Sequence, residues 1–160
     1  MDFFLLYRIT PNREQYLTVS SMEEQEALRM YMRGDSRPNA PVPMEIHNTK
    51  KVDMFLCAGH FLATEKVLQL LRNNGITGWE TYDVKVTNSK PGTPAIFGLI
   101  FRGRLGPYIP DWTIKLSTWD GADFCTFEKG YSPVVTSTVM NIFQRENIRG
   151  VYSQQLSVIP

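Results

Sequence analysis

This chain has few of the residues from which most disulfide scaffolds and metal sites are built: of 160 residues, two are cysteine and two are histidine. Two cysteines are too few for a disulfide framework, and both lie among apolar neighbours, as buried free thiols do in a reducing compartment. Long apolar runs are also absent, since no stretch approaches the roughly 18 residues that cross a bilayer. The apolar N-terminal segment is short and ends at Arg8, unlike a signal peptide. We expect a cytoplasmic protein with no membrane partner.

Charge of one sign is lacking as well. The chain carries 17 basic and 16 acidic residues, for a net charge of +1. A nucleic-acid surface needs a basic excess, and an inhibitor that imitates nucleic acid needs an acidic one. The sequence therefore predicts no nucleic-acid partner. Its length and ordinary apolar content predict a single domain over residues 1–160.

Metal-binding motifs are incomplete. Cys57 and His60 are three positions apart, and His47 and Cys125 would complete a set of four ligands. Structural zinc sites usually show two such short spacings, and this chain shows one. We expect no metal.

Motifs for catalysis and for phosphate binding are missing too. The glycines at 98, 103 and 106 are not followed by Lys-Ser or Lys-Thr, so they do not form a phosphate loop. Asp120-Gly121 is typical of a turn. We expect no catalytic residues, no cofactor and no enzymatic activity.

What the sequence does contain is a weak internal repeat. Residues 62–84 align with residues 134–156 at an offset of 72, with Thr64 matching Thr136 and Gly78 matching Gly150. Each copy has a threonine, an apolar stripe at helical spacing, and an Ile-x-Gly ending. We expect Thr64 and Thr136 to cap their helices through their side chains. The fold is thus expected to contain two related units.

The predicted fold class is α+β: a mostly antiparallel sheet with two repeated cap-helix-strand units and an N-terminal strand/helix arm. Within the arm we predict a strand over 3–9, a helix over 22–32 with a cap at Ser20-Ser21, and a loop over 34–43. Residues 95–101 are apolar enough for a central strand, residues 103–107 read as a turn, and residues 112–116 and 150–158 as strands. The predicted segments are the arm and loop 1–43, the first helix unit 52–87, the central strands 95–127 and the second helix unit 132–159.

Three short motifs resemble a known family. They are Thr64-Glu65-Lys66, Gly75-Ile76-Thr77-Gly78 and Gly103-Arg104-x-Gly106-Pro107, followed by Asp123-Phe124 and a second helix unit. In this order they are similar to immunity family eleven of bacterial polymorphic-toxin loci, over about two thirds of the chain. Leu105 departs from the family, where cysteine is frequent. The resemblance implies a non-catalytic immunity protein whose partner is a cognate toxin, and it supplies no catalytic residues.

A contact surface for such a partner is predicted between residues 102 and 123. This stretch mixes arginine and aromatic residues with turns, which is the composition of interface centres. Trp112 is expected to be core, on one strand face with Ile114 and Leu116. The predicted contact residues are Arg104, Tyr108, Trp119 and Asp120. The alternative is that residues 102–123 form the site of a small-ligand-binding domain or of an uncharacterised enzyme.

Overall fold

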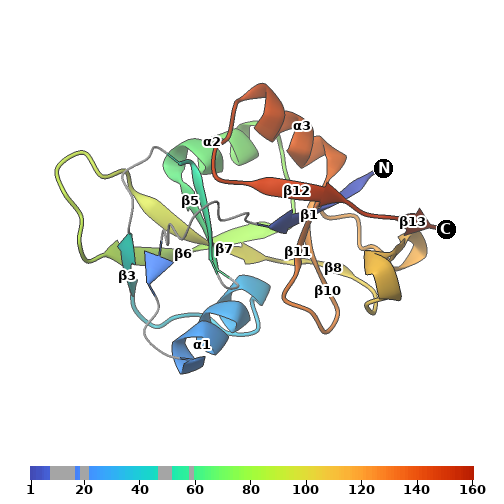
Figure 1. Cartoon of the computed structure of the whole chain (residues 1–160), viewed down its shortest axis with the longest axis horizontal. Coiled ribbons are helices and arrows are strands. Elements are labelled where there is room, and N and C mark those ends of the chain that lie inside the picture. The colour runs from blue at the N-terminus through green and yellow to red at the C-terminus, as the bar shows by residue number, and fades with distance from the viewer. Residues whose placement is uncertain (8–16, 19–21, 47–51, 58–59) are drawn as a thin grey trace.

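The computed structural model describes residues 1–7, 17–18, 22–46, 52–57 and 60–160. The predicted α+β class is confirmed, with mostly antiparallel pairing (Figure 1). None of the helices in these residues is long and apolar enough to cross a membrane. The larger sheet contains, in spatial order, β2 (Leu17–Thr18), β3 (Val42–Ile46), β6 (Trp79–Val86), β7 (Ile96–Phe101), β5 (His60–Thr64) and β4 (Met54–Cys57).

A second sheet lies beside the first. It contains, in spatial order, β12 (Tyr152–Gln155), β1 (Phe3–Tyr7), β11 (Pro133–Thr136), β10 (Phe124–Phe127) and β8 (Gly103–Leu105). The remaining elements are the parallel pair β9 (Ile114–Lys115) and β13 (Val158–Ile159), the helices α1 (Met22–Arg33), α2 (Glu65–Asn73) and α3 (Ser137–Arg145), and two short 3-10 turns at Pro110–Trp112 and Leu116–Thr118.

The two sheets are built on one plan. Ala63 of β5 pairs with Met54 and Phe97, and Val135 of β11, 72 positions later, pairs with Phe124 and Phe4 in the same arrangement. The equivalence continues through α2 and α3 into the strand that follows each helix, where β6 corresponds to β12 and β13 together. β6 pairs in parallel with β3, and β13 pairs in parallel with β9 in the same way. The first unit thus comprises β3 to β6 with β7, and the second comprises β9 to β13 with β1. We call the two units together the frame.

The central strands of the two units are exchanged along the chain. β7 follows the first unit's last strand, yet it lies between β5 and β6. β1 opens the chain and lies between β11 and β12 of the second unit. Each half of the sequence therefore supplies the strand at the middle of the other half's sheet. β1 is not part of a peripheral arm, because its pairing partners come from the opposite end of the chain.

The hydrophobic core follows the same plan. A central cluster joins the inner faces of α2 and α3 to the strands, with Leu71 and Leu99 from the first unit and Phe143 and Leu6 from the second. An outer cluster covers each unit. The first contains Leu28, Met44, Phe55, Leu62, Tyr82, Ile96 and Ile100, and the second contains Phe3, Leu105, Ile114, Cys125, Phe127, Val134 and Leu156. Helix α1 covers the first of these outer clusters through Leu28.

Two equivalent aspartates connect the units. Asp53 Oδ2 accepts a hydrogen bond of 3.0 Å from the Arg149 amide, and Asp123 Oδ2 accepts one of 3.0 Å from the Thr77 amide. Thr77 and Arg149 are equivalent, each lying beyond the helix of the opposite unit. Gly78, which follows Thr77, packs against Phe124 of β10, and Gly150, which follows Arg149, packs against Met54 of β4. The units are therefore joined by a reciprocal pair of contacts.

Several predicted loops and strands differ from the structure. Residues 103–105 form β8 rather than a turn, because Gly103 allows close approach to β10, where a Cβ would lie 2.5 Å from the Phe124 carbonyl oxygen. The loop predicted over 34–43 ends earlier, because β3 begins at Val42 and accommodates Pro43. The predicted strand 112–116 reduces to β9, since Trp112 has a φ of 55°. The strand predicted over 150–158 is divided into β12 and β13.

The helix caps differ from prediction in a specific way. Thr64 and Thr136 occupy the N-cap positions of α2 and α3, but neither side chain bonds its helix. The Thr136 hydroxyl instead donates to Asp123 Oδ1 at 2.7 Å. Thr64 Oγ1 is buried without a hydrogen-bond partner within the described residues. The predicted cap at Ser20-Ser21 lies outside the described residues, as do residues 8–9 of the predicted first strand.

Substituting the two threonines with valine is expected to have unequal effects. Thr136→Val should lower the free energy of unfolding by about 1–2 kcal/mol, because it removes a hydrogen bond to a carboxylate. Thr64→Val keeps the shape and removes an unsatisfied hydroxyl, so it should be neutral or stabilising by up to about 1 kcal/mol. Urea denaturation midpoints compare the pair. Equal losses in both variants would contradict the assigned contacts.

Candidate functional site

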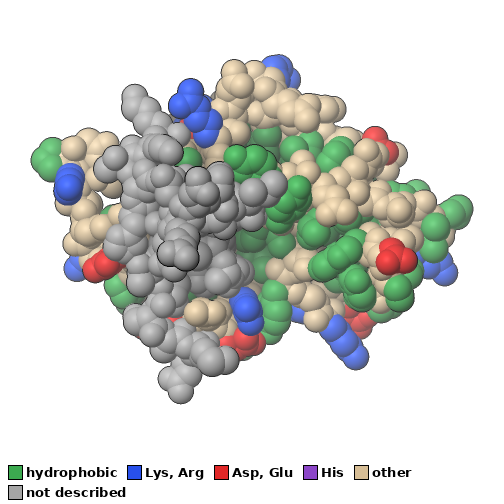
Figure 2. Space-filling model, viewed as in Figure 1, with side chains coloured by type: hydrophobic (Ala, Val, Ile, Leu, Met, Phe, Trp, Pro, Cys, Tyr) green, Lys and Arg blue, Asp and Glu red, His purple; other side chains and the backbone are tan. Residues whose placement is uncertain are grey.

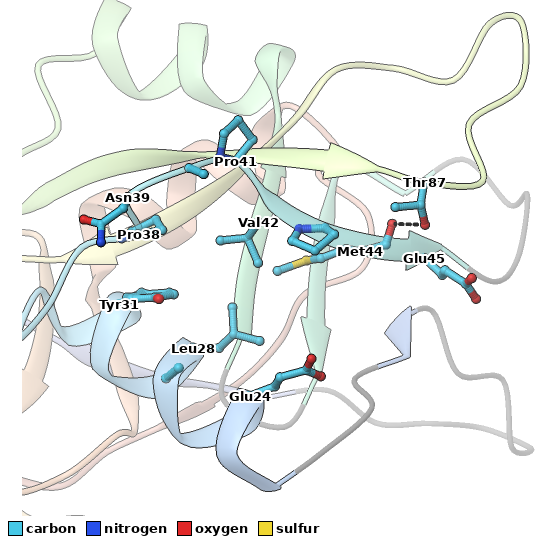
Figure 3. Close-up of a pocket in the computed structure, with 13 residues that line it drawn as sticks. Glu24, Leu28, Tyr31, Pro38, Asn39, Pro41, Val42, Met44, Glu45 and Thr87 are labelled. Atoms are coloured by element: carbon cyan, nitrogen blue, oxygen red, sulfur yellow. Dashed lines mark hydrogen bonds between the residues drawn. The ribbon is translucent and has the colours of Figure 1, made fainter.

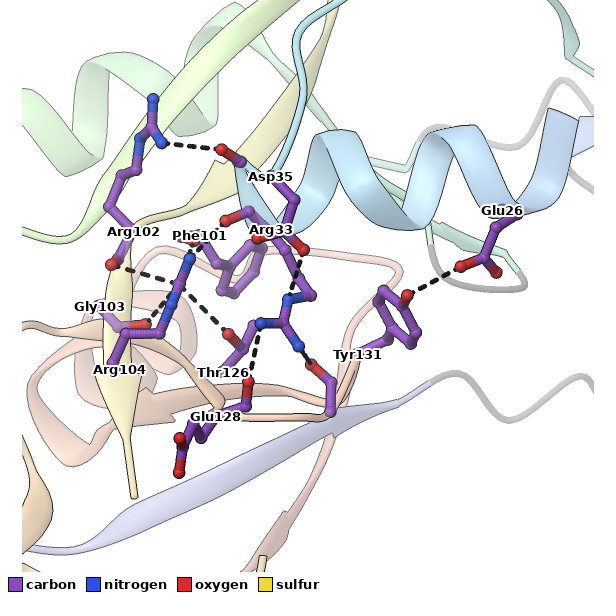
Figure 4. Close-up of polar contacts among 12 residues, drawn as sticks. Glu26, Arg33, Asp35, Phe101, Arg102, Gly103, Arg104, Thr126, Glu128 and Tyr131 are labelled. Atoms are coloured by element: carbon purple, nitrogen blue, oxygen red, sulfur yellow. Dashed lines mark hydrogen bonds and ion pairs between the residues drawn. The ribbon is translucent and has the colours of Figure 1, made fainter. Parts of the chain in front are cut away.

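Arg104, predicted to contact a partner, is bound within the protein. Its Nη2 donates to the Arg33 carbonyl oxygen at 2.7 Å, and its Nη1 donates to the Phe101 carbonyl oxygen at 3.0 Å and to Thr126 Oγ1 at 3.3 Å. Burial, and secondarily the charge of Arg33, lowers the pKa of Arg104. Figure 4 shows the guanidinium enclosed between the end of α1 and the strands. Arg104 therefore connects α1 to the frame.

Two further arginines fix the same end of α1. Arg33 donates to the carbonyl oxygens of Glu128 at 2.8 Å and Gly130 at 3.0 Å, and its Nε forms an ion pair of 2.8 Å with Asp35. Arg102 donates to the Gly34 carbonyl oxygen at 3.2 Å and pairs with Glu80. Cations beside the carbonyl end of a helix are favourable because the helix dipole is negative there. This arginine cluster holds α1 in place.

Trp119 and Asp120 are also engaged internally. The Trp119 ring packs edge-on against Phe3 at 5.1 Å, and its indole N–H donates to the Ala122 carbonyl oxygen at 2.8 Å. The Asp120 carboxylate accepts hydrogen bonds from the amides of Arg104 at 2.7 Å and Ala122 at 3.0 Å. The predicted Asp-Gly turn is thus present, and the hydrogen bond from the Arg104 amide to Asp120 connects it to β8.

Tyr108 is the most exposed of the four predicted contact residues, with half of its surface open to solvent. Its ring packs edge-on against Trp112 at 5.0 Å and Phe127 at 5.7 Å. Trp112 is half-buried against the outer core, as expected, but Leu116 is exposed and does not share its environment. The structure brings Arg104 and Asp120 into direct contact. The contact role of all four residues stays a prediction.

Three of the four Cys and His residues considered as zinc ligands lie in the described part of the chain. Cys57 and His60 are the last pair in the β4–β5 hairpin. His47 lies outside the described residues. The buried Cys125 thiol donates to the Ala122 carbonyl oxygen at 3.0 Å, and burial raises its pKa to about 12. Within the described part of the chain, no three His, Cys, Asp or Glu side chains gather where they could hold a metal ion.

A groove that the sequence does not predict lies between α1 and β3. This groove has a volume of about 660 Å³ and is lined by Leu28 and Tyr31 of α1, Val42 and Met44 of β3, and the proline-containing segment 38–41 between them. Figure 3 shows the α1 side chains directed at those of β3 across an open space. Among the described residues that line it, Glu24 and Glu45 carry carboxylates. The three prolines in the sequence indicated a loop there, but nothing in their pattern indicated that the loop borders a groove.

A second surface feature lies near the C-terminus. Tyr152, Val158 and Ile159 are each at least 36% exposed. Figure 2 shows hydrophobic side chains gathered on this side of the molecule, with charged groups mainly at its margin. Comparison with protein-family models and with curated proteins finds no match to this chain.

Proposed function

We propose that this protein is a non-catalytic immunity protein that binds and neutralises a cognate bacterial toxin domain in the cytoplasm. The observation that carries the proposal is where the family-like motifs fall. Thr77 and Gly78 form the contact between the units, and Arg104 attaches α1 to the frame. The resemblance therefore rests on residues that maintain a fixed shape.

A fixed shape is what a stoichiometric inhibitor needs. An inhibitor whose surface is ordered before binding loses less conformational entropy on association. A tight complex would bury about 1,600 Å² in total. The alternative, a ligand site or enzyme within residues 102–123, would need polar groups free to act, whereas Arg104 and Asp120 already bind within the protein. We therefore place that alternative second.

The test uses the toxin domain encoded beside this gene, purified with its own catalytic residue replaced. We expect the two proteins to elute together from size exclusion as a 1:1 complex, and cells that express the active toxin to survive only with this protein. A toxin domain from an unrelated locus is the control. Separate elution at micromolar concentrations, with no protection of cells, would contradict the proposed function.

A further inference from the structure

β12 forms one end of the second sheet, and no other described strand pairs with its outer edge (Figure 1). The Leu156 amide donates to the Phe3 carbonyl oxygen at 2.9 Å. Because backbone hydrogen bonds alternate in direction along an antiparallel strand, Ser153 and Gln155 direct their N–H and C=O groups away from β1. Within the described residues, these groups have no hydrogen-bond partner. The edge of β12 is therefore open to one more strand.

The strand at the opposite end of the same sheet is covered. The Arg104 amide of β8 donates to Asp120 Oδ2 at 2.7 Å, and the Asp120 amide donates to the Arg104 carbonyl oxygen at 3.2 Å. A residue outside the sheet thus satisfies both backbone groups of Arg104. A sheet edge that is covered in this way is protected from pairing with another chain.

The edge of the first unit that is equivalent to β12 is covered as well. At the offset of 72, Ser153 and Gln155 correspond to two residues of β6 that face the segment 37–41 across a cavity of about 260 Å³. In the second unit the corresponding connection, residues 102–113, is much shorter, and its aromatic side chains pack against Phe127 instead. The plan of two units therefore leaves β12 uncovered where it covers β6.

The composition of this edge favours a second copy of the chain as the added strand. Residues 150–160 contain no Asp, Glu, Lys, Arg or His. When a strand pairs with its own copy about a twofold axis, any charge near the axis meets a like charge, which an uncharged segment avoids. Gln154 is exposed at the middle of the strand, and its amide can both donate to and accept from its own copy. Tyr152, Val158 and Ile159 add exposed apolar surface to the same segment.

We propose that β12 pairs in antiparallel fashion with β12 of a second copy, about a twofold axis at Gln154. In this register the backbone groups of Ser153 pair with those of Gln155 in the second copy, and the two Gln154 residues lie opposite each other, with Cα atoms about 4.5 Å apart. The two five-stranded sheets then join into one continuous sheet. The proposal goes beyond the proposed function and does not depend on it, because a dimer that binds two toxin domains still contains the two chains at 1:1.

Two opposite charges at one position test the proposal. For the wild-type protein alone, sedimentation velocity over a range of concentrations should show a dimer with a Kd on the order of 10 µM, as suits a small interface. Gln154→Lys and Gln154→Glu each place like charges opposite each other, so either variant alone should raise the dimer Kd at least about tenfold at low salt. An equal mixture of the two variants places opposite charges together and should restore the dimer to at least the wild-type level.

A matched control separates pairing from folding and from net charge. Gln69→Lys makes the same substitution at an exposed position of α2, and it should dimerise like the wild type. All variants should keep the wild-type urea denaturation midpoint, since position 154 is exposed. Amide hydrogen exchange of the wild type adds a measurement that needs no variant. The amides of Ser153 and Gln155 should exchange more slowly as the protein concentration rises through the dimer Kd.

Restored association in the mixture supports the proposal, because only a contact of position 154 with its own copy predicts it. A wild-type protein that stays monomeric up to about 200 µM, more than tenfold above the expected Kd, overturns the proposal. It is also overturned if both charged variants dimerise like the wild type, or if their mixture stays monomeric. If the wild type is monomeric and the charged variants instead weaken binding to the toxin domain, β12 receives a strand of the toxin, which overturns the inference while the proposed function stands.

Discussion

Gly150→Ala is expected to lower the free energy of unfolding by about 4 kcal/mol, because it combines backbone strain with a steric overlap. Gly150 has a φ of 98°, which is unfavourable for residues that carry a Cβ. A Cβ at this position would also overlap the carbonyl oxygen of Met54, a backbone atom that cannot rotate away. Chemical denaturation of the purified variant measures the loss.

Gly121→Ala is the matched control. Gly121 has a similar φ of 92°, but a Cβ there would meet no atom within 4 Å. Gly121→Ala should therefore lower the free energy of unfolding only through backbone strain, by about 1–2 kcal/mol. Gly78→Ala, equivalent to Gly150→Ala in the other unit, should be nearly as damaging as Gly150→Ala because its Cβ would lie 2.6 Å from the Phe124 carbonyl oxygen. Equal losses at Gly121 and Gly150 would refute the close packing between units.

Asp123→Ala is expected to reduce the free energy of unfolding by about 3 kcal/mol, because it removes a charged acceptor from several donors. Asp123 accepts from the Thr77 amide and hydroxyl, each at 3.0 Å, and from the Thr136 hydroxyl at 2.7 Å. The Thr136 side chain is fully buried, so its hydroxyl would be left without a partner. Asp53→Ala should cost less, about 1–2 kcal/mol, because Thr64 does not bond to Asp53 through its hydroxyl.

A double-mutant cycle isolates the buried part of this contact. In a Thr136→Val background, Asp123→Ala should lower the free energy of unfolding by at least about 1 kcal/mol less than it does in the wild type. The reason is that valine has no hydroxyl to be left buried without a hydrogen-bond partner. Denaturation of the four proteins of the cycle gives the coupling energy. Additive losses would show that the hydroxyl and the carboxylate do not depend on each other.

The sequence predicted the repeat from its helices, and the structure extends it to the strands. The apolar stripes and Ile-x-Gly endings carry a local signal, so α2 and α3 follow from the sequence alone. The equivalence of β1 and β7 does not, because both are simply apolar, and their exchange is decided by pairing with distant strands. β8 was missed for a similar reason, since Gly103 indicates a turn unless β10 is known to approach it.

The site residues show the limit of composition as a guide. Arg104, Trp119 and Asp120 have the residue types enriched at interfaces, yet the same groups serve well as internal donors, acceptors and packing surfaces. Composition does not distinguish these roles, whereas the hydrogen bonds to Arg33, Ala122 and Arg104 do. Tyr108→Ala is thus the substitution in that group that tests partner contact with the least effect on the frame.

The exchange of β1 and β7 bears on how the chain is made. A nascent chain that has not yet extended beyond residue 95 contains β5 and β6 but lacks the strand that pairs with both. Its first strand must in turn wait for β12, because Leu5 pairs with Gln154 near the other terminus. Contacts of such long sequence separation slow folding, since the intervening chain has to be ordered before they form. We therefore expect the six strands of the larger sheet to pair once residue 101 has left the ribosome, and the second sheet to form only after β12 has been made.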